Sequence, residues 1–290
     1  MFIEMKNDDL VFVADMLGRI NCSAKNIFIQ AYKNKGLINC LIFSDDNNKG
    51  VFTILQGSNY FSLQISFEKD VSNYKILKII HEELNKILKI KGSKDIYLNI
   101  NGYNPSIINY FRNYNFSQDS LGFEYYFSRL SENIDTISTF NIRDGLTIKS
   151  YEEKNAYKYL ELLDEAFRDL NIECNEEQEQ FSKSSEKFIS WLRKVDGKKN
   201  FGALWNNLDL VGVYILNDDC IDTIAVNPNY EGKGYGTQLI KYCLKNMIID
   251  KKYEEVYLRV YFQNIKAQKF YLKNGFKIRG YYSENTYISK

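Results

Sequence analysis

The stretch VNPNYEGKGYGTQL, residues 226–239, places three glycines at alternate positions between an apolar run and a helical pattern. They are Gly232, Gly234 and Gly236, in a chain with only 16 glycines among 290 residues, so their clustering needs a reason. Glycine lets a ligand approach the main chain closely because it has no side chain. The free N–H groups and positive end of a helix that begins here favour a phosphate or pyrophosphate. A plain glycine turn before a helix is the alternative that this stretch alone leaves open.

Two common phosphate-binding loops do not fit the stretch. A P-loop requires GxxxxGK followed by Ser or Thr, which is missing here. A dinucleotide-binding fold requires GxGxxG after a first parallel strand, with an acidic residue about 20 residues further on. The observed spacing is GxGxG, and three predicted strands separated by Asn and Asp turns precede it, at 201–207, 210–216 and 220–226. Such closely spaced strands predict an antiparallel meander.

The rest of the C-terminal half alternates between strand and helix signals. Residues 146–151, 255–261 and 280–289 read as strands, and 152–167, 187–195 and 265–274 as helices. Asn264 is positioned to cap the last of these helices and Gly275 to end it. The helix after the glycines has a predicted core face that consists of Leu239, Ile240, Cys243, Leu244, Met247 and Ile248. The half is therefore predicted to be α+β, with a mixed, mostly antiparallel sheet flanked by helices.

A hidden repeat links the two halves of the chain. KDIYLNINGYNPSIINYFRNYNF, residues 94–116, aligns without a gap with EEVYLRVYFQNIKAQKFYLKNGF, residues 254–276. The shared pattern of strand, Asn and helix ending in an aromatic predicts a duplicated domain. We expect the boundary in the polar segment 131–145, with domains at 1–135 and 143–290. The matched pairs include Tyr97 and Tyr257, Leu98 and Leu258, Asn104 and Asn264, and Phe116 and Phe276.

Two motifs together carry a resemblance to a known family. IDTIAVNPNYEGKGYGTQLI, residues 221–240, is followed by NIKAQKFYLKNGF, residues 264–276. This combination resembles the GNAT superfamily of acetyl-CoA-dependent N-acyltransferases, whose loop Q/R-x-x-G-x-G/A binds the CoA pyrophosphate. Its later segment reads N-x-x-A-x-x-F-Y-x-x-x-G-F. The chain departs at the first loop position, which is Glu231; we expect its side chain to point to solvent while Lys233 supplies positive charge.

The resemblance implies tandem GNAT-like domains and an N-acetyltransferase that moves an acetyl group from acetyl-CoA to a primary amine by direct attack. A CoA-binding sensor or pseudo-enzyme without turnover, and an interaction scaffold, are the alternatives. Acetyl-CoA is the implied co-substrate, and no metal is expected. The implied cofactor-binding residues are Ala225, Val226, Glu231, Gly232, Lys233, Gly234, Tyr235, Gly236, Thr237, Asn264 and Tyr271.

Three residues are implied to take part in the chemistry. Tyr271 matches a tyrosine that protonates the leaving thiolate, and a core aromatic is the alternative because the chain has 23 tyrosines. The main-chain N–H of Val226 would face the thioester carbonyl. Asp222 is the candidate base for the amine, with Asp218 and Asp219 as alternatives, although NDD is also an ordinary turn.

The first half lacks the features that would bind CoA. At the offset of the repeat, the three loop glycines fall on Ser72, Tyr74 and Ile76, and Tyr271 falls on Phe111. We therefore expect a degenerate GNAT-like domain without a glycine loop, which acts as a structural partner.

Composition limits the partners. The net charge is +1, so neither nucleic acid nor an anionic membrane is expected. Five scattered cysteines without a CxxC pair favour reduced thiols in the cytoplasm. The expected acceptor is a small-molecule amine or a peptide N-terminus. The four glutamates in 173–179 could attract a cationic amine, but a solvated helical face explains them as well.

Overall fold

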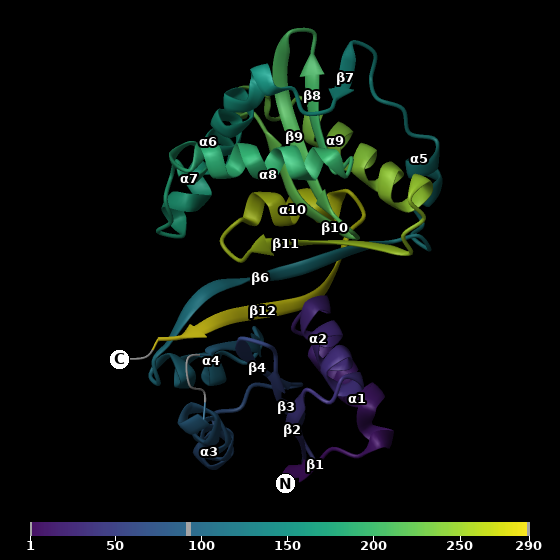
Figure 1. The fold of residues 1–290 in the computed structure, drawn as a ribbon. Coiled ribbons are helices and arrows are strands. Elements are labelled where there is room, and N and C mark those ends of the chain that lie inside the picture. The colour runs from purple at the N-terminus through teal and green to yellow at the C-terminus, as the bar shows by residue number, and fades with distance from the viewer. Residues whose placement is uncertain (1, 91–93, 289–290) are drawn as a thin grey trace. The chain divides into compact units, whose positions relative to one another are not determined.

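The computed structural model describes residues 2–90 and 94–288. The chain forms two compact units (Figure 1). The first contains residues 1–124, 260–262 and 278–290, and the second contains residues 125–259 and 263–277. The chain therefore returns to the first unit after it has completed the second.

The first unit is built on a sheet in the order β1-β2-β3-β4-β5-β12. Neighbouring strands in this order are antiparallel except β4 with β5, which run parallel. Strand β6, Phe116–Ser128, begins in this unit. The strands are β1 Phe2–Glu4, β2 Leu37–Ser44, β3 Lys49–Gln56, β4 Tyr60–Phe67, β5 Asp95–Asn101 and β12 Lys277–Tyr287. The helices are η1 Asn7–Asp9, α1 Leu10–Gly18, α2 Cys22–Lys33, α3 Tyr74–Ile90 and α4 Pro105–Arg112.

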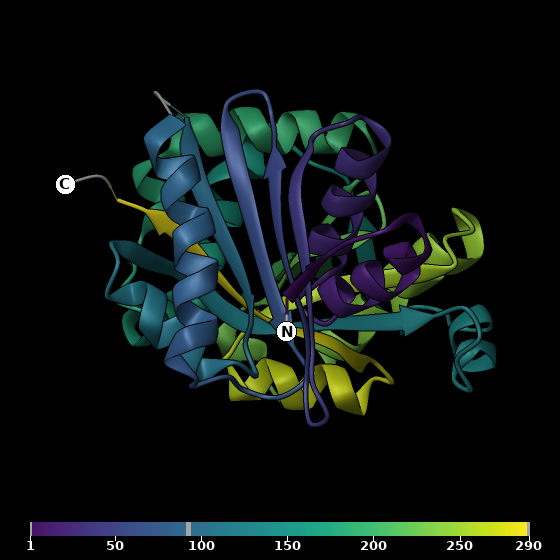
Figure 2. The same ribbon diagram turned by 90° about the horizontal axis from the view of Figure 1, so that it is seen from below.

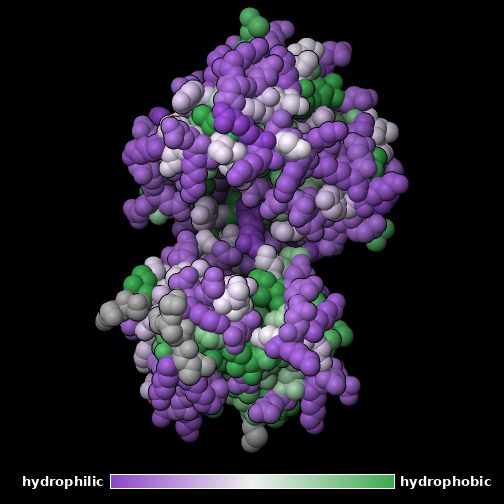
Figure 3. Space-filling view, viewed as in Figure 1, coloured by the Kyte–Doolittle hydropathy of each residue, from purple (hydrophilic) through white to green (hydrophobic). Residues whose placement is uncertain are grey.

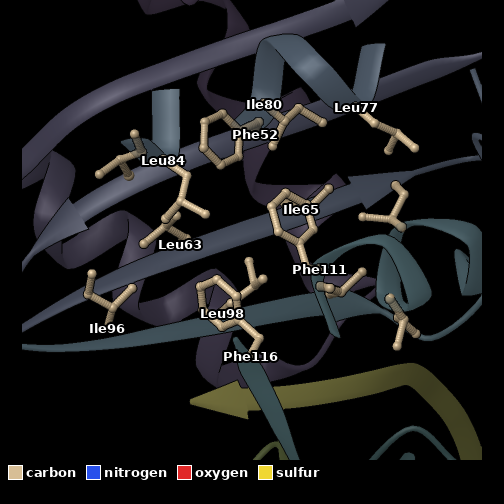
Figure 4. Close-up of a cluster of buried hydrophobic side chains, with 14 of the residues drawn as sticks. Phe52, Leu63, Ile65, Leu77, Ile80, Leu84, Ile96, Leu98, Phe111 and Phe116 are labelled. Carbon is tan, nitrogen blue, oxygen red and sulfur yellow. The ribbon is translucent and has the colours of Figure 1, made fainter. Parts of the chain in front are cut away.

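Helices cover both faces of this sheet, because successive side chains along each strand point to opposite faces. Phe61, Leu63 and Ile65 of β4 point to the face where α3 and α4 pack, as Figure 4 shows for part of this cluster. The other face carries a second cluster with α1 and α2, which includes Leu17 and Phe28. Figure 2 shows α3 and the α1–α2 pair on opposite sides of the strands. The first unit is therefore a three-layer α/β/α arrangement.

The second unit has a sheet in the order β11-β10-β9-β8-β7, in which β10 and β11 run parallel and the other pairs antiparallel. The predicted meander of three strands is confirmed. The strands are β7 Leu146–Lys149, β8 Phe201–Asn206, β9 Asp209–Asn217, β10 Cys220–Val226 and β11 Glu255–Tyr261. The helices are α5 Ile134–Ser138, η2 Glu153–Asn155, α6 Ala156–Glu173, α7 Gln180–Lys183, α8 Ser185–Gly197, η3 Pro228–Tyr230, α9 Tyr235–Leu244, η4 Lys245–Asp250 and α10 Ile265–Lys273.

Helices cover both faces of this sheet as well. Val213 of β9 lies in a buried cluster with α6 and α8. The preceding residue, Gly212, faces the opposite way, and a Cβ there would lie 2.7 Å from Leu239 of α9. All six residues of the predicted core face of this helix are buried. Helix α9 therefore packs against the sheet with the apolar face that the sequence predicts.

The element boundaries repeat between the units, which confirms the duplication. Strands β4 and β5 begin at Tyr60 and Asp95, and their counterparts β10 and β11 begin 160 positions later at Cys220 and Glu255. Helix α4 begins at Pro105, and its counterpart α10 begins 160 positions later at Ile265.

Some elements differ from the sequence-based expectation. The segment 131–145 contains helix α5, which has only five residues and a single buried side chain, Ile137, so it leaves no periodic signal. Helix α7 has four residues and is held by the buried carboxylate of Asp164, which accepts hydrogen bonds from the N–H groups of Phe181 and Ser182. The last strand forms as predicted, but it pairs with β5 in the first unit.

Hydrophilic residues cover most of the visible surface of each unit in Figure 3. Among the helices of the described residues, none has the length and apolar character needed to cross a membrane.

Candidate functional site

Two of the three clustered glycines are required by the backbone. Gly232 has φ +72°, and Gly234, the residue before helix α9, has φ +84°. Side chains other than glycine rarely adopt such values. Gly236 allows close packing, because a Cβ there would lie only 3.3 Å from the ring of Phe270 on α10, which would have to shift slightly. The glycines therefore shape the loop and bring α9 close to α10.

The first N–H groups of α9 have no hydrogen-bond partner among the residues that the structure describes. The first bond of this turn runs from the N–H of Gln238 to the oxygen of Gly234, at 3.2 Å. The N–H groups of Tyr235, Gly236 and Thr237 precede it, and such groups have no acceptor within a helix. A Cβ built on Gly232 meets no atom within 4 Å, so space is open beside the loop. This is a suitable place for an anionic group.

Charged side chains of the loop are partly engaged. The exposed carboxylate of Glu231 pairs with Lys266 of α10, which neutralises the acidic residue at the first loop position. The ammonium of Lys233 donates to the oxygen of Asn229 at 3.0 Å and lies 4.9 Å from the centre of the Tyr230 ring. Lys233 is thus held on the Tyr230 side of the loop.

Strands β10 and β11 separate soon after they begin. Their register contains one paired position, Cys220 with Tyr257, next to a bond of 3.0 Å from the N–H of Tyr257 to the oxygen of Asp219. In the first unit, the corresponding strands β4 and β5 are paired at six positions, from Tyr60 with Asp95 to Ile65 with Ile100. The second unit therefore has a gap between two parallel strands at a place where the first unit is closed.

The N–H of Val226 faces this gap. Along an antiparallel pair, positions that are hydrogen-bonded to the partner strand alternate with positions that are not. Asn227 donates to the oxygen of Val211 at 3.0 Å, so Val226, which is opposite Gly212, directs its N–H away from β9. Its neighbour Ala225 is buried in the cluster under α6. The main-chain donor predicted from the sequence is therefore available on the side where β11 has separated.

The repeated asparagine has a different role in each unit. Asn264 accepts a hydrogen bond from the N–H of Ala267 at 3.0 Å, so the predicted cap of α10 is confirmed. Asn104 does not cap α4. Its amide accepts from the N–H of Phe67 at 2.9 Å and donates to the oxygen of Phe67 at 3.2 Å. In the first unit this side chain satisfies the main chain at the end of β4.

Tyr271 lies on α10 in an aromatic environment. Its exposed fraction is 9 %, and its ring centre lies 5.2 Å from that of Phe270, 5.6 Å from Phe276 and 6.2 Å from Tyr125. Within the described part of the chain, no residue is hydrogen-bonded to the phenol. Burial raises the pKa of Tyr271 well above its ordinary value, and the nearby thiols of Cys243 and Cys220 add to the effect. The phenol therefore keeps its proton at neutral pH.

The acidic candidates lie at one end of β10. Asp222 is exposed, at an irregularity in the pairing of β10 with β9, and accepts a bond of 3.2 Å from the hydroxyl of Thr223. Asp218 belongs to the turn before the strand, with φ +49°. Asp219 contributes its main-chain oxygen to Tyr257. The exposed position of Asp222 leaves it accessible to water.

The structure adds residues that the sequence analysis missed. Lys266 pairs with Glu231 from 35 positions away, and Arg143 reaches the loop from the segment before β7. No local pattern identifies such long-range neighbours. A hollow of about 490 Å³ also lies beside the loop, lined by Lys158, Leu208, Asp209, Leu210, Asn227, Asn229, Tyr230 and Lys233.

Part of the chain matches a known protein family. Residues 160–276 match the model of the acetyltransferase (GNAT) family. No curated protein matches the chain. The second unit therefore contains a domain of the GNAT family, whose fold is that of acyl-CoA-dependent acyltransferases.

Solved structures extend the likeness to both units. A GCN5-related N-acetyltransferase from Sphaerobacter thermophilus is 11 % identical with a TM-score of 0.53, covering 99 % of this chain and 94 % of its own. A Drosophila protein is 10 % identical with a TM-score of 0.50, covering 99 % and 98 %. A tandem GNAT protein from the clavulanic acid biosynthesis pathway is 11 % identical with a TM-score of 0.45, covering 99 % and 97 %. The whole chain therefore shares the fold of the Sphaerobacter thermophilus structure, and its repeated element boundaries divide this fold into two GNAT-like copies.

Proposed function

We propose that the protein is a cytoplasmic N-acetyltransferase that transfers an acetyl group from acetyl-CoA to a primary amine through the 143–290 domain. The observation that supports this most is the gap between β10 and β11, next to a glycine loop with free N–H groups. The gap offers an extended ligand a place between two strands, and the loop offers its phosphates a place at the start of α9.

In the proposed complex, the pyrophosphate accepts hydrogen bonds from the main chain between Gly232 and Thr237. The pantetheine arm passes Asn264 and lies between the strands. The thioester carbonyl faces the N–H of Val226, which stabilises the negative charge that develops on its oxygen. A neutral amine attacks the carbonyl carbon directly, the C–N bond forms, and the C–S bond breaks.

Proton transfers complete the reaction. The amine loses its proton to Asp222, directly or through water, since this carboxylate is exposed. The leaving thiolate takes a proton from Tyr271. Burial raises the pKa of this phenol, but a thiolate released in the same buried place also has a raised pKa, because desolvation disfavours both anions. The transfer is therefore less unfavourable than it would be to a thiolate in water.

The first unit is proposed to be a structural partner without CoA. Its strands β4 and β5 are paired along their length, and Asn104 holds the end of β4. The acceptor is proposed to be a small-molecule amine or a peptide N-terminus.

A CoA-binding sensor without turnover is the second candidate. The exposed position of Asp222 favours it, since a carboxylate that lies in water and, among the described residues, bonds only to the neighbouring Thr223 hydroxyl is a weak base for the amine.

Calorimetric titration with acetyl-CoA tests the proposal. Saturable binding is expected, and the absence of binding at millimolar ligand would exclude an acetyl-CoA enzyme. A panel of amines and peptides, assayed for free thiol, then separates the two candidates. Thiol release that depends on one acceptor class supports the transferase, whereas binding without release from any acceptor supports the sensor.

A further inference from the structure

A cationic side chain from outside the family motif lies at the glycine loop. The guanidinium nitrogen Nη2 of Arg143 is 3.3 Å from the position that a Cβ on Gly234 would occupy. Arg143 belongs to the irregular segment between α5 and β7, and its side chain is exposed. Within the described residues, no carboxylate pairs with it. The charge is therefore available beside the main chain that would contact the pyrophosphate.

This segment is fixed along helix α9 and its continuation η4. The Nζ of Lys245 donates to the oxygen of Phe140 at 2.7 Å, and the Nζ of Lys241 lies 6.0 Å from the centre of the Phe140 ring. The N–H of Arg143 donates to Oε1 of Gln238 at 3.0 Å. Residues separated by three and four positions share one face of a helix. The segment thus runs along one helical face toward the start of α9 and ends with Arg143 at the loop.

We propose that Arg143 is a phosphate-binding residue of the acyl-CoA site and contacts the pyrophosphate. This inference rests on the proposed function. A guanidinium binds phosphate oxygens through two parallel hydrogen bonds, which a single ammonium does not provide. Glu231 pairs with Lys266, and the ammonium of Lys233 keeps its charge but is directed to the oxygen of Asn229 and the ring of Tyr230. Arg143 therefore places a positive charge beside Gly234, in a loop whose first position is the acidic Glu231.

The test compares Arg143→Gln with Arg129→Gln. Arg129 is a half-exposed arginine of the second unit, paired with Glu254 at 3.5 Å, so its substitution changes the net charge equally without touching the loop. Dissociation constants for CoA and 3′-dephospho-CoA are measured by calorimetry. Arg143→Gln is expected to weaken both ligands about 10- to 100-fold, because a hydrogen bond to a charged group is lost, and Arg129→Gln to leave both unchanged.

The outcomes separate this inference from the proposed function. If the unaltered protein binds neither ligand, the proposed function fails. If the unaltered protein binds CoA and the two variants bind it equally well, only the role of Arg143 is wrong. If Arg143→Gln weakens the binding of CoA but not of 3′-dephospho-CoA, the arginine contacts the 3′-phosphate, and the assignment to the pyrophosphate is wrong. Circular dichroism of each variant shows whether it is folded, and Arg143→Lys, which keeps the charge, is expected to recover part of the affinity.

Discussion

At the scale of single residues, the site depends on backbone conformation and on one buried phenol. Gly234 has a left-handed backbone and lies beside the guanidinium of Arg143, whereas Tyr271 on α10 packs against the rings of Phe270 and Phe276. A side chain added at Gly234 should therefore prevent CoA binding. Removal of the hydroxyl of Tyr271 should instead lower turnover.

Gly234→Val is expected to abolish CoA binding. A β-branched side chain resists φ +84° and would occupy the place where the pyrophosphate meets the main chain. The matched control is Tyr74→Val at the aligned position of the first unit. Tyr74 is 63 % exposed, so this change should alter the stability by no more than about 0.5 kcal/mol. Calorimetry measures both, and CoA binding retained by a folded Gly234→Val protein would place the pyrophosphate elsewhere.

Tyr271→Phe is expected to lower the turnover number about 10- to 1,000-fold while acetyl-CoA affinity stays nearly unchanged. The proton is needed mainly in the transition state, and water replaces the phenol poorly. Stopped assays of thiol release, with calorimetry for affinity, give the two quantities. An unchanged rate, where chemistry limits turnover, would assign Tyr271 to the hydrophobic core.

At the scale of elements, the same strand–helix unit occurs twice with different consequences. In the first unit β4 and β5 pair continuously, and in the second β10 and β11 separate. The asparagine before the following helix also differs between the units. Asn104 bonds to the end of β4, where the two strands pair, whereas Asn264 caps α10, where the two strands separate.

The two asparagines therefore predict different losses on substitution. Asn104 is fully buried and satisfies two main-chain groups of Phe67, so Asn104→Ala should cost about 2 to 4 kcal/mol. Asn264→Ala removes a cap and should cost about 1 kcal/mol. Urea denaturation followed by fluorescence measures both. Equal losses would show that the two bonds of Asn104 to Phe67 contribute no more than the single cap bond of Asn264.

At the scale of the whole molecule, the structure predicts one CoA for each chain. The second unit has the open strands and the glycine loop, and the first has neither. Calorimetric stoichiometry and mass spectrometry of the intact complex measure the ratio. A ratio of two, or one CoA retained after the change at Gly234, would mean that the binding site lies in the first unit or in both.

Much of the fold could be predicted from the sequence because its elements have strong local signals. The meander, the buried face of α9 and the cap at Asn264 each depend on neighbours within a few positions. The positions of Arg143 and Lys266 could not be predicted, since they depend on contacts between distant segments. The partner of β12 is a similar case: alternation predicts a strand but does not identify the strand beside it.

The return of the chain to the first unit makes the C-terminal strand depend on the first copy. Strand β12 carries the C-terminal sequence, yet it adds to β5, from Tyr282 beside Asn101 to Thr286 beside Tyr97. A deletion of the first copy would leave this strand with an unpaired edge, and such edges promote aggregation. If the first copy binds no CoA, as proposed, the pairing of β5 with β12 still gives a physical reason to keep it.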